Sequence, residues 1–222
     1  MKKRRKIISV AIDSPAAAGA GTQAKLIAKE YNLLYLDTGK IYRLLGKIRI
    51  QNKKKFTKKL VKKKIKNIKI LDLNDKNLIN DDIAISASII AKDKAIRNIV
   101  KSFQKNCAYN PPLKYSGSVL DGRDITSVIM KDAMFKFYIT ANLKERSKRR
   151  YIEFKKLKKN VLFKDVLKSL RNRDYLDKTR SHSPLKKTQD SILINTSKLS
   201  KKACFFKIKD IIDKKLSING NI

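Results

Sequence analysis

Short apolar runs, each followed by a longer amphipathic stretch, recur along this chain. The first run, residues 7–12, is rich in β-branched side chains and ends at Asp13-Ser14-Pro15. A run of this length between charged residues and a turn is typical of a strand buried on both faces of a parallel sheet. Similar strand signals occur at residues 33–36, 117–120, 135–140 and 191–195.

The stretches between these runs have helical spacing. We predict a helix over about residues 21–31, a second that follows the capping residues Asp37-Thr38-Gly39 and continues to Ile50, and an amphipathic helix near the C-terminal end. Strands that alternate with helices predict an α/β fold, in which a parallel sheet of five strands is flanked by helices on both faces. Ligands of such sheets bind beyond the carboxyl ends of the strands.

Two segments interrupt this alternation. Residues 53–112 are too long for a single crossover and have strong helical character from residue 81 to residue 105, so we predict an inserted substrate-binding subdomain there. Residues 151–163 are rich in Lys and lie between two predicted helices. They are either a mobile segment that closes over a polyanion or a solvated helix end.

The composition is that of a globular protein with an unusual charge. The chain has 222 residues, 42% of them hydrophobic, with 7 Gly and 4 Pro, and this predicts a single domain over residues 1–222. Its net charge of +36 attracts polyanions such as nucleotides, nucleic acid or anionic lipid. The lysines are scattered through every segment, so a compositional bias toward Lys explains the charge as well as nucleic-acid binding does.

The cysteines and the apolar runs bear on the location of the protein. Cys107 and Cys204 lack the spacing of a metal site or a disulfide framework. The apolar stretch near the N-terminus is ended by Asp13 before it reaches the length of a signal sequence. No apolar run approaches the length of a membrane span. We therefore expect a cytoplasmic protein without a membrane partner.

A loop of small residues follows the first predicted strand and leads into the first predicted helix. Successive backbone N–H groups in such a loop can bind phosphate at the helix N-terminus. The phosphate-loop pattern G-x-x-x-x-G-K-[ST] requires Gly at position 14 and Lys at position 20, where this chain has Ser and Ala. An ordinary strand-to-helix connection is therefore the alternative. The residues of the loop are Ser14, Pro15, Ala16, Ala17, Ala18, Gly19, Ala20, Gly21 and Thr22.

Further motifs follow this loop in a characteristic order. They are Leu-Asp-Thr-Gly-Lys-Ile-Tyr-Arg at residues 36–43, then Ser88 and Arg97, then Leu-Asp-Gly-Arg-Asp at residues 120–124, then Arg173, Asp177 and Arg180. In this order the chain resembles the bacterial cytidylate kinases, which are nucleoside monophosphate kinases with the P-loop fold. The resemblance extends from Ile7 to about Ile212.

The resemblance implies a fold, a reaction and substrates. The fold is the P-loop kinase fold, with residues 53–112 as the monophosphate-binding subdomain and residues 151–163 as a short lid. The reaction is transfer of a phosphoryl group from ATP to CMP and dCMP, with Mg²⁺, to give ADP and CDP or dCDP. We expect a monomer that has no specific nucleic-acid partner. A kinase of UMP or AMP is the nearest competing interpretation, and the base-reading residues decide between them.

The resemblance also implies roles for the arginines and their partners. Arg43, Arg123 and Arg180 match positions that bind phosphate oxygens and are the candidate catalytic residues, because a guanidinium binds phosphate through two parallel hydrogen bonds. Surface ion pairs are the alternative for each of them. Arg146 and Arg150 match a basic helix that faces the phosphates of ATP.

Other positions match residues that bind CMP. Ser88, Arg97 and Asp124 match the residues that read the base, where Asp124 accepts a hydrogen bond from the amine that uracil lacks. Arg173 and Asp177 match the ribose-binding positions, although a helical i,i+4 salt bridge also explains them. Thr38 contacts the monophosphate or simply caps a helix. No residue is expected to bind a metal directly, and Asp121 is a candidate to hold Mg²⁺ through water.

The residue at position 20 departs from the family. The lysine that the family has there reaches the transferring phosphates, and losing its charge costs several kcal/mol of transition-state stabilisation. Either the chain is a non-catalytic nucleotide- or RNA-binding protein on a decayed kinase scaffold, or the cation has moved. We favour relocation, with Lys40 as the candidate, because the remaining substrate-binding set is intact. Lys25 is less attractive, since one further helical turn carries it away from the loop.

Overall fold

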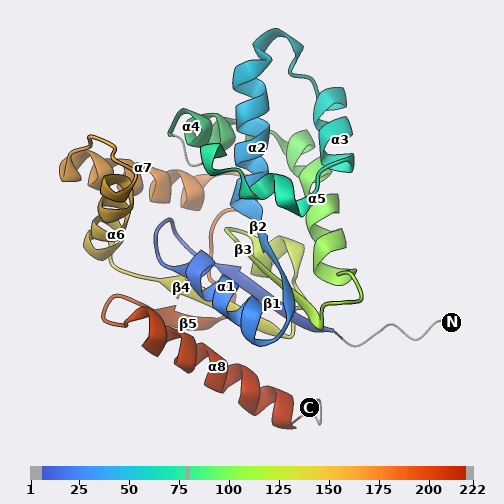
Figure 1. The fold of residues 1–222 in the computed structure, drawn as a ribbon, viewed down its shortest axis with the longest axis vertical. Coiled ribbons are helices and arrows are strands. Elements are labelled where there is room, and N and C mark those ends of the chain that lie inside the picture. Colours follow the sequence, from blue (N-terminus) through green and yellow to red (C-terminus); the bar gives the residue numbers. More distant parts are fainter. Residues whose placement is uncertain (1–6, 79–80, 219–222) are drawn as a thin grey trace, which may run out of the picture.

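A five-stranded parallel sheet forms the centre of the molecule in the computed structural model, which describes residues 7–78 and 81–218 (Figure 1). The strands lie in the order β2-β3-β1-β4-β5. The expected α/β architecture with five parallel strands is confirmed, and each strand signal in the sequence corresponds to one strand. The strands are β1 (Ile8–Asp13), β2 (Leu33–Asp37), β3 (Gly117–Gly122), β4 (Phe135–Thr140) and β5 (Ile192–Asn195).

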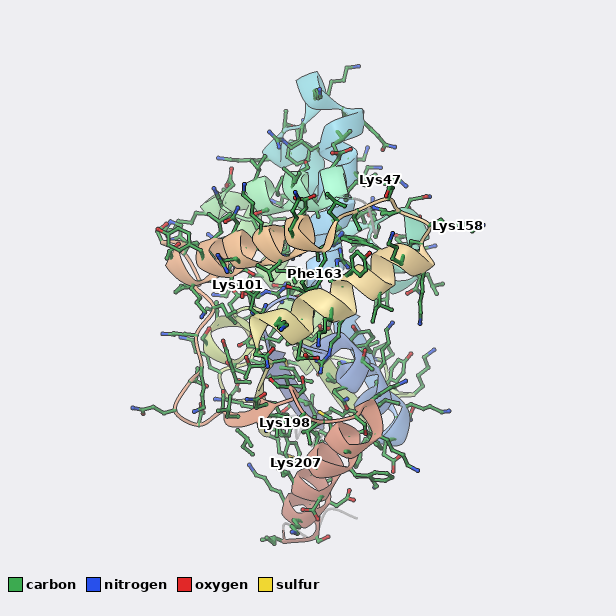
Figure 2. All side chains as sticks on the ribbon, turned by 90° about the vertical axis from the view of Figure 1, so that its left-hand side faces the viewer. Lys47, Lys101, Lys158, Phe163, Lys198 and Lys207 are labelled. Atoms are coloured by element: carbon green, nitrogen blue, oxygen red, sulfur yellow. The ribbon has the colours of Figure 1, made fainter. Side chains whose placement is uncertain are left out.

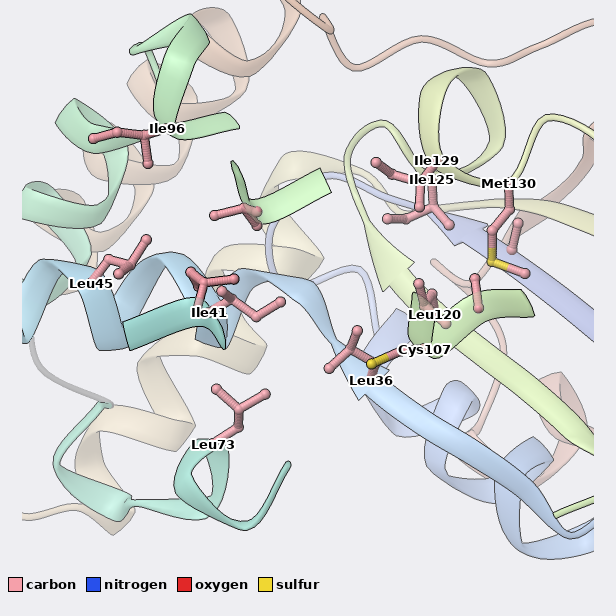
Figure 3. Packing of buried hydrophobic residues seen from close by; sticks show 14 of the residues in the cluster. Leu36, Ile41, Leu45, Leu73, Ile96, Cys107, Leu120, Ile125, Ile129 and Met130 are labelled. Atoms are coloured by element: carbon pink, nitrogen blue, oxygen red, sulfur yellow. The ribbon is translucent and has the colours of Figure 1, made fainter. Parts of the chain in front are cut away.

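Both faces of this sheet are buried, because helices cover each of them. Val10 and Ile12 of β1 pack with the helices α1 (Ala20–Glu30) and α8 (Lys201–Ile218), which lie together on one side of the sheet (Figure 1). Ala11, the residue between them, points to the opposite face, since successive side chains alternate across a strand. On that face Leu36, Leu120 and Cys107 lie together in the core (Figure 3).

A group of helices stands at one end of the sheet, between β2 and β3 in the sequence. The stretch predicted as helical from residue 81 to residue 105 is divided into two helices, because Asp93 accepts hydrogen bonds from Ala95 N–H at 2.8 Å and Ile96 N–H at 3.0 Å and so caps a new helix. The elements here are α2 (Thr38–Gln51), η1 (Lys53–Lys55), α3 (Lys58–Lys66), η2 (Ile70–Asn74), η3 (Lys76–Leu78), α4 (Asp81–Ile90) and α5 (Lys94–Tyr109).

Helices α2 and α4 approach each other closely at Gly46. A Cβ atom at this position would lie 2.8 Å from the Ile83 carbonyl oxygen and 2.9 Å from the backbone nitrogen of Ala87, so any side chain would push the two helices apart. Arg43 adds a hydrogen bond from its guanidinium to the Leu78 carbonyl at 2.8 Å. The small residue in α2 thus allows α4 to pack closely against it.

The predicted lid at residues 151–163 is largely not a loop. Residues 151–156 are the last turns of α6 (Leu143–Lys156), residues 157–162 connect it to α7 (Phe163–Thr179), and Phe163 begins that helix. Lys158 lies at the turn of this connection (Figure 2). The helical part packs against α7, where the rings of Tyr151 and Phe163 meet edge to face at 5.9 Å between centroids. Apolar contacts thus hold the two ends of this segment, while most of its lysines are exposed.

The positive charge is spread over the surface. Figure 2 labels Lys47, Lys101, Lys158, Lys198 and Lys207, which come from different elements of the fold. Among the described residues no helix is both long and apolar enough to cross a membrane.

Candidate active site

The loop of small residues after β1 folds into a phosphate-binding conformation. Ser14 N–H donates to the Gly122 carbonyl at 3.1 Å and ties the start of the loop to the end of β3. Ala17, with φ 61°, and Gly19, with φ 95°, both adopt left-handed backbone conformations before α1 begins at Ala20. Alternation of left- and right-handed residues turns successive N–H groups toward one point at the positive end of the helix.

A cleft of about 430 Å³ opens beside this loop, at the carboxyl ends of the strands. It brings together segments that are far apart in the sequence, and nearly all of the residues proposed from the sequence line it. These are all nine loop residues Ser14 to Thr22, together with Thr38, Arg43, Ser88, Arg97, Asp121, Arg123, Asp124, Arg150, Arg173, Asp177 and Arg180. The two proposed residues that do not line the cleft are Arg146 and Lys40.

One end of the cleft is built around an ion pair between Arg97 and Asp124. Their nitrogen and oxygen atoms are 2.6 Å apart, and both side chains are at most one-tenth exposed. The Arg97 guanidinium also donates to the Ala91 carbonyl at 3.3 Å and lies 5.7 Å from the centre of the Tyr42 ring. A donor and an acceptor held side by side against an aromatic ring can bind a planar base with polar edges.

The position of Asp124 depends on Asp13 at the end of β1. The Asp13 carboxylate accepts hydrogen bonds from Ile125 N–H at 2.7 Å, from Thr126 N–H at 2.9 Å and from the Thr126 hydroxyl at 2.6 Å. Burial raises the pKa of Asp13 to about 6 despite these bonds. The strand that leads into the phosphate loop therefore also holds the turn η4 (Ile125–Ile129) that follows Asp124.

The centre of the cleft holds several guanidinium groups close together. Arg123 donates to Asp177 at 2.7 Å, and Arg180 lies 3.8 Å from the same carboxylate. Burial, followed by the charge of Arg123, lowers the pKa of Arg173 to about 10. Burial likewise lowers the pKa of Arg180, whose Nη2 is buried without a hydrogen-bond partner in the described part of the chain. Crowded buried cations of this kind are stabilised by a bound anion.

Asp177 is the carboxylate that holds this group together. Burial alone would raise its pKa, but the charges of Arg123 and Arg173 outweigh that effect and lower it. The i,i+4 salt bridge that the sequence offered for Arg173 and Asp177 is not the observed arrangement, since the direct partner of Asp177 is Arg123, which lies on the loop after β3.

A pair of carboxylates lies between the phosphate loop and this arginine group. Asp37 and Asp121 face each other at the ends of the neighbouring strands β2 and β3. Burial and the nearby Asp37 carboxylate raise the pKa of Asp121 to about 8, even though Tyr35 donates a hydrogen bond to it. Its Oδ1 atom is buried and has no hydrogen-bond partner among the described residues. A buried carboxylate oxygen without a donor is a position where a cation or an ordered water binds favourably.

The Thr38 side chain links the start of α2 to the end of β3 and does not cap α2. Its hydroxyl donates to the Asp121 carbonyl at 2.8 Å, and the helix is capped by Asp37, which accepts from Lys40 N–H at 3.3 Å. The Thr38 oxygen would lie only 2.5 Å from a Cβ atom at position 122, so this tight junction requires Gly122. The N-cap alternative for Thr38 is therefore wrong, and its side chain lines the cleft.

Arg146 holds the phosphate loop from behind instead of facing the cleft. Its guanidinium donates to Asp174 at 3.0 Å, to the Ala16 carbonyl at 3.2 Å and to the Ala141 carbonyl at 2.9 Å. These bonds occupy its donors, and the side chain is 6% exposed. The interpretation of Arg146 as a residue that faces the phosphates of ATP is therefore corrected, whereas Arg150 does line the cleft.

The structure also changes the account of the lysines. Lys40 lies in the first turn of α2 and does not line the cleft, so its proposed role as the replacement cation has no support from the geometry. Lys25 does line the cleft. Sequence reasoning also missed Tyr35 and the partner Asp174. Asp37 could have been found, because it stands inside the Asp-Thr-Gly motif and ends a strand next to the one that Asp121 ends.

A parallel sheet with a phosphate loop after its first strand, and with an arginine-rich cleft at the strand ends, defines a P-loop nucleotide kinase. A sequence model of the cytidylate kinase family matches residues 10–214. The chain belongs to the cytidylate kinase family, whose members are phosphotransferases acting on nucleotides.

Curated relatives agree with this assignment, and a solved structure shares the fold. A cytidylate kinase of Bartonella bacilliformis is 41% identical over 92% of this chain and 94% of its own length. A cytidylate kinase of Clostridium botulinum is 38% identical over 95% of this chain and 97% of its own length. A crystal structure of an uncharacterized protein from Eubacterium ventriosum shares the fold, with a TM-score of 0.56 at 19% identity, over 94% of this chain and 99% of that one.

Proposed function

We propose that this protein transfers the γ-phosphoryl group of ATP to CMP and dCMP. The observation that carries the proposal is the single cleft, which joins a phosphate-binding loop to a buried cluster of arginines and to the Arg97–Asp124 pair. In the reaction the bond between the β–γ bridging oxygen and the γ-phosphorus of ATP breaks. A new bond forms between that phosphorus and a phosphate oxygen of the nucleoside monophosphate, and ADP leaves.

The loop would bind the phosphates of ATP, and the arginines would bind the monophosphate and the transferring group. The N–H groups around Ala17 and Gly19 bind the phosphates of ATP at the start of α1. Arg43, Arg123 and Arg180 face the monophosphate and the transferring group, where planar guanidinium groups stabilise the charge that spreads over the phosphoryl oxygens. Arg150, on α6, lines the ATP side of the same cleft.

The other end of the cleft would read the nucleoside. Asp124 accepts from the cytosine amine while Arg97 and Ser88 offer donors to the ring nitrogen and the carbonyl. Arg173 and Asp177, which line the same cleft, would bind the ribose hydroxyls. Uracil lacks the amine and places a carbonyl oxygen against the Asp124 carboxylate, so UMP is rejected by an unpaired acceptor.

A Mg²⁺ ion fits the carboxylate pair at the ends of β2 and β3. The unpartnered buried Oδ1 of Asp121, next to Asp37, is the position that would hold the ion through water. Bound there, the metal supplies positive charge to the β- and γ-phosphates.

The test is an assay of ADP formation with ATP, Mg²⁺ and a panel of CMP, dCMP, UMP and AMP, run beside the variant Ala20→Lys. We expect turnover that depends on CMP or dCMP and exceeds turnover with UMP or AMP. Turnover only in Ala20→Lys would mean that the substrate site is intact on a scaffold that has lost catalysis. No turnover by either protein, together with tight and salt-sensitive binding of long RNA, would support the nucleic-acid-binding alternative instead.

A further inference from the structure

The position that carries the lysine of other family members contains a buried methyl group in this chain. Ala20 is 4% exposed and packs with Ala18 and Ala24 in the core between the sheet and α1. No cation therefore extends from the tip of the loop. If the chain transfers phosphoryl groups, another positive charge must approach the β- and γ-phosphates from a different direction.

Lys25 approaches the loop from the next turn of the same helix. It lies four residues after Gly21, hence on the same face of α1, and side chains on a helix lean toward its N-terminus. Gly21 has no side chain to block that path, and a Cβ atom there would lie 3.5 Å from Asp121 Oδ2. The face that Lys25 covers thus leads directly to the carboxylate pair beside the loop.

The structure places Lys25 beside the loop. Its side chain lines the cleft together with the loop residues and with Asp37 and Asp121. The extra helical turn therefore does not carry this side chain away from the cleft, and a long lysine side chain can extend toward the helix N-terminus.

Several other basic groups of the cleft are held by carboxylates or lie elsewhere. On the ATP side, Arg150 is paired with Glu153 at 2.8 Å. Arg97 and Arg123 are held by Asp124 and Asp177. Lys92 follows α4, at the end of the cleft where the base would bind. Lys25 is exposed and takes part in no ion pair found in the described ranges 7–78 and 81–218, so its ammonium group can be redirected to a ligand.

We propose that Lys25 supplies the cation that neutralises the β- and γ-phosphates of ATP in place of the absent loop lysine. This rests on the proposed function as far as turnover is concerned, but its effect on ATP binding does not. The positive charge would enter over Gly21, beside the Asp121 carboxylate, instead of from the tip of the loop.

The experiment compares Lys25→Met with Lys25→Arg, and it uses Lys29→Met as a matched control. Lys29 is an exposed lysine in the last turn of the same helix, and it lies outside the cleft. Calorimetry measures Kd for Mg–ATP and for CMP separately, and the ADP assay measures kcat. We expect Lys25→Met to raise Kd for Mg–ATP about tenfold, to leave Kd for CMP unchanged and to lower kcat about 100-fold. Lys25→Arg should retain much of the affinity for Mg–ATP and much of kcat, and Lys29→Met should leave both quantities unchanged.

The outcomes separate this inference from the proposed function. If the parent shows no CMP-dependent turnover but Lys25→Met still weakens Mg–ATP binding selectively, the proposed function fails and the role of Lys25 stands. If the parent is active and Lys25→Met keeps both ATP affinity and kcat within twofold, the inference is overturned and the function stands. A loss of kcat in Lys40→Met with Lys25→Met unaffected would also overturn it.

Discussion

The two halves of the cleft present different chemical groups, backbone N–H groups in one and side chains in the other. The phosphate loop offers mainly backbone N–H groups to a ligand, and most of its side chains are methyl groups or hydrogen atoms. The proposed monophosphate half is lined by polar and charged side chains from α2, α4, α5, α7 and the loop after β3. These side chains are held by ion pairs such as Arg97–Asp124 and Arg123–Asp177, at 2.6 and 2.7 Å.

This difference explains which positions of the cleft depart from the family's motifs. A backbone site survives substitution as long as the chain can still adopt its dihedral angles, since every residue except proline brings the same N–H group. A side-chain site loses its function when one partner of a buried pair is replaced. Accordingly, Ser14 and Ala20 depart from the loop pattern although the loop keeps its shape, whereas the arginines and aspartates of the other half match the family.

The largest effect is expected at Arg123, in the side-chain half. Arg123→Met removes a phosphate-binding fork and leaves Asp177 buried without its direct partner. We expect kcat/KM for CMP to fall about 10³-fold, the range seen when a charge-stabilising group is removed from a phosphoryl-transfer site. Steady-state assays of ADP formation measure this.

Two further variants sharpen the test at Arg123. Arg123→Lys keeps the charge without the planar fork and should recover only part of the loss. Arg171→Met changes an exposed arginine of α7 outside the cleft and should leave kcat/KM unchanged. A full recovery with lysine would mean that charge alone, and not bidentate geometry, is needed at this position.

The support behind the loop should be the next most sensitive feature. Arg146→Met leaves the partly buried Asp174 carboxylate without its ion-pair partner and removes the bond to the Ala16 carbonyl. We expect the free energy of unfolding to fall by about 3 kcal/mol, as for other broken buried pairs. Urea unfolding measures it. The double variant Arg146→Met with Asp174→Leu should recover most of the loss, because no unpaired charge remains. An equal loss in both variants would contradict the ion-pair explanation.

The same contrast between backbone and side chains determines how much the sequence could predict. All five strands were predictable, because a strand buried on both faces is a nearly continuous apolar run such as residues 7–12. Most of the cleft was predictable from motifs, since the residues after β1, β2 and β3 meet at one edge of the sheet.

Side-chain direction was not predictable from spacing. Arg146 and Arg150 stand one helical turn apart in α6, yet one binds Asp174 behind the loop and the other lines the cleft. We ranked Lys40 above Lys25 because a further helical turn was expected to carry Lys25 away from the loop, but Lys25 lines the cleft and Lys40 does not. For the Lys-rich segment 151–163 the alternative of a helix end describes residues 151–156, where Tyr151 and Phe154 pack with the apolar cluster between α6 and α7.

Replacing Asp124 should change the preference for CMP over UMP. The expected effect is smaller than the loss of kcat/KM expected when Arg123 is replaced. Asp124→Asn replaces an acceptor with an amide that can donate to the uracil carbonyl. We expect the ratio of kcat/KM for CMP to that for UMP to fall about 30-fold, within the 1–3 kcal/mol that one paired hydrogen-bond contact to a base contributes. Assays with both nucleotides on the same preparation provide the internal control. A uniform loss for both substrates would show that Asp124 positions Arg97 but does not read the base.

The smallest expected effect lies in the backbone half, at Ala17. A left-handed conformation costs a residue with a Cβ atom about 1–2 kcal/mol, whereas glycine adopts it freely but loses more entropy on folding. Ala17→Gly should therefore raise the free energy of unfolding by about 1 kcal/mol in urea, with ATP affinity unchanged because the N–H groups stay in place. Ala203→Gly, at an exposed helical position in α8, should lower it instead. A loss of stability in Ala17→Gly would mean that packing of the Ala17 side chain stabilises the loop. This half of the cleft would then depend on side chains as well as on backbone N–H groups.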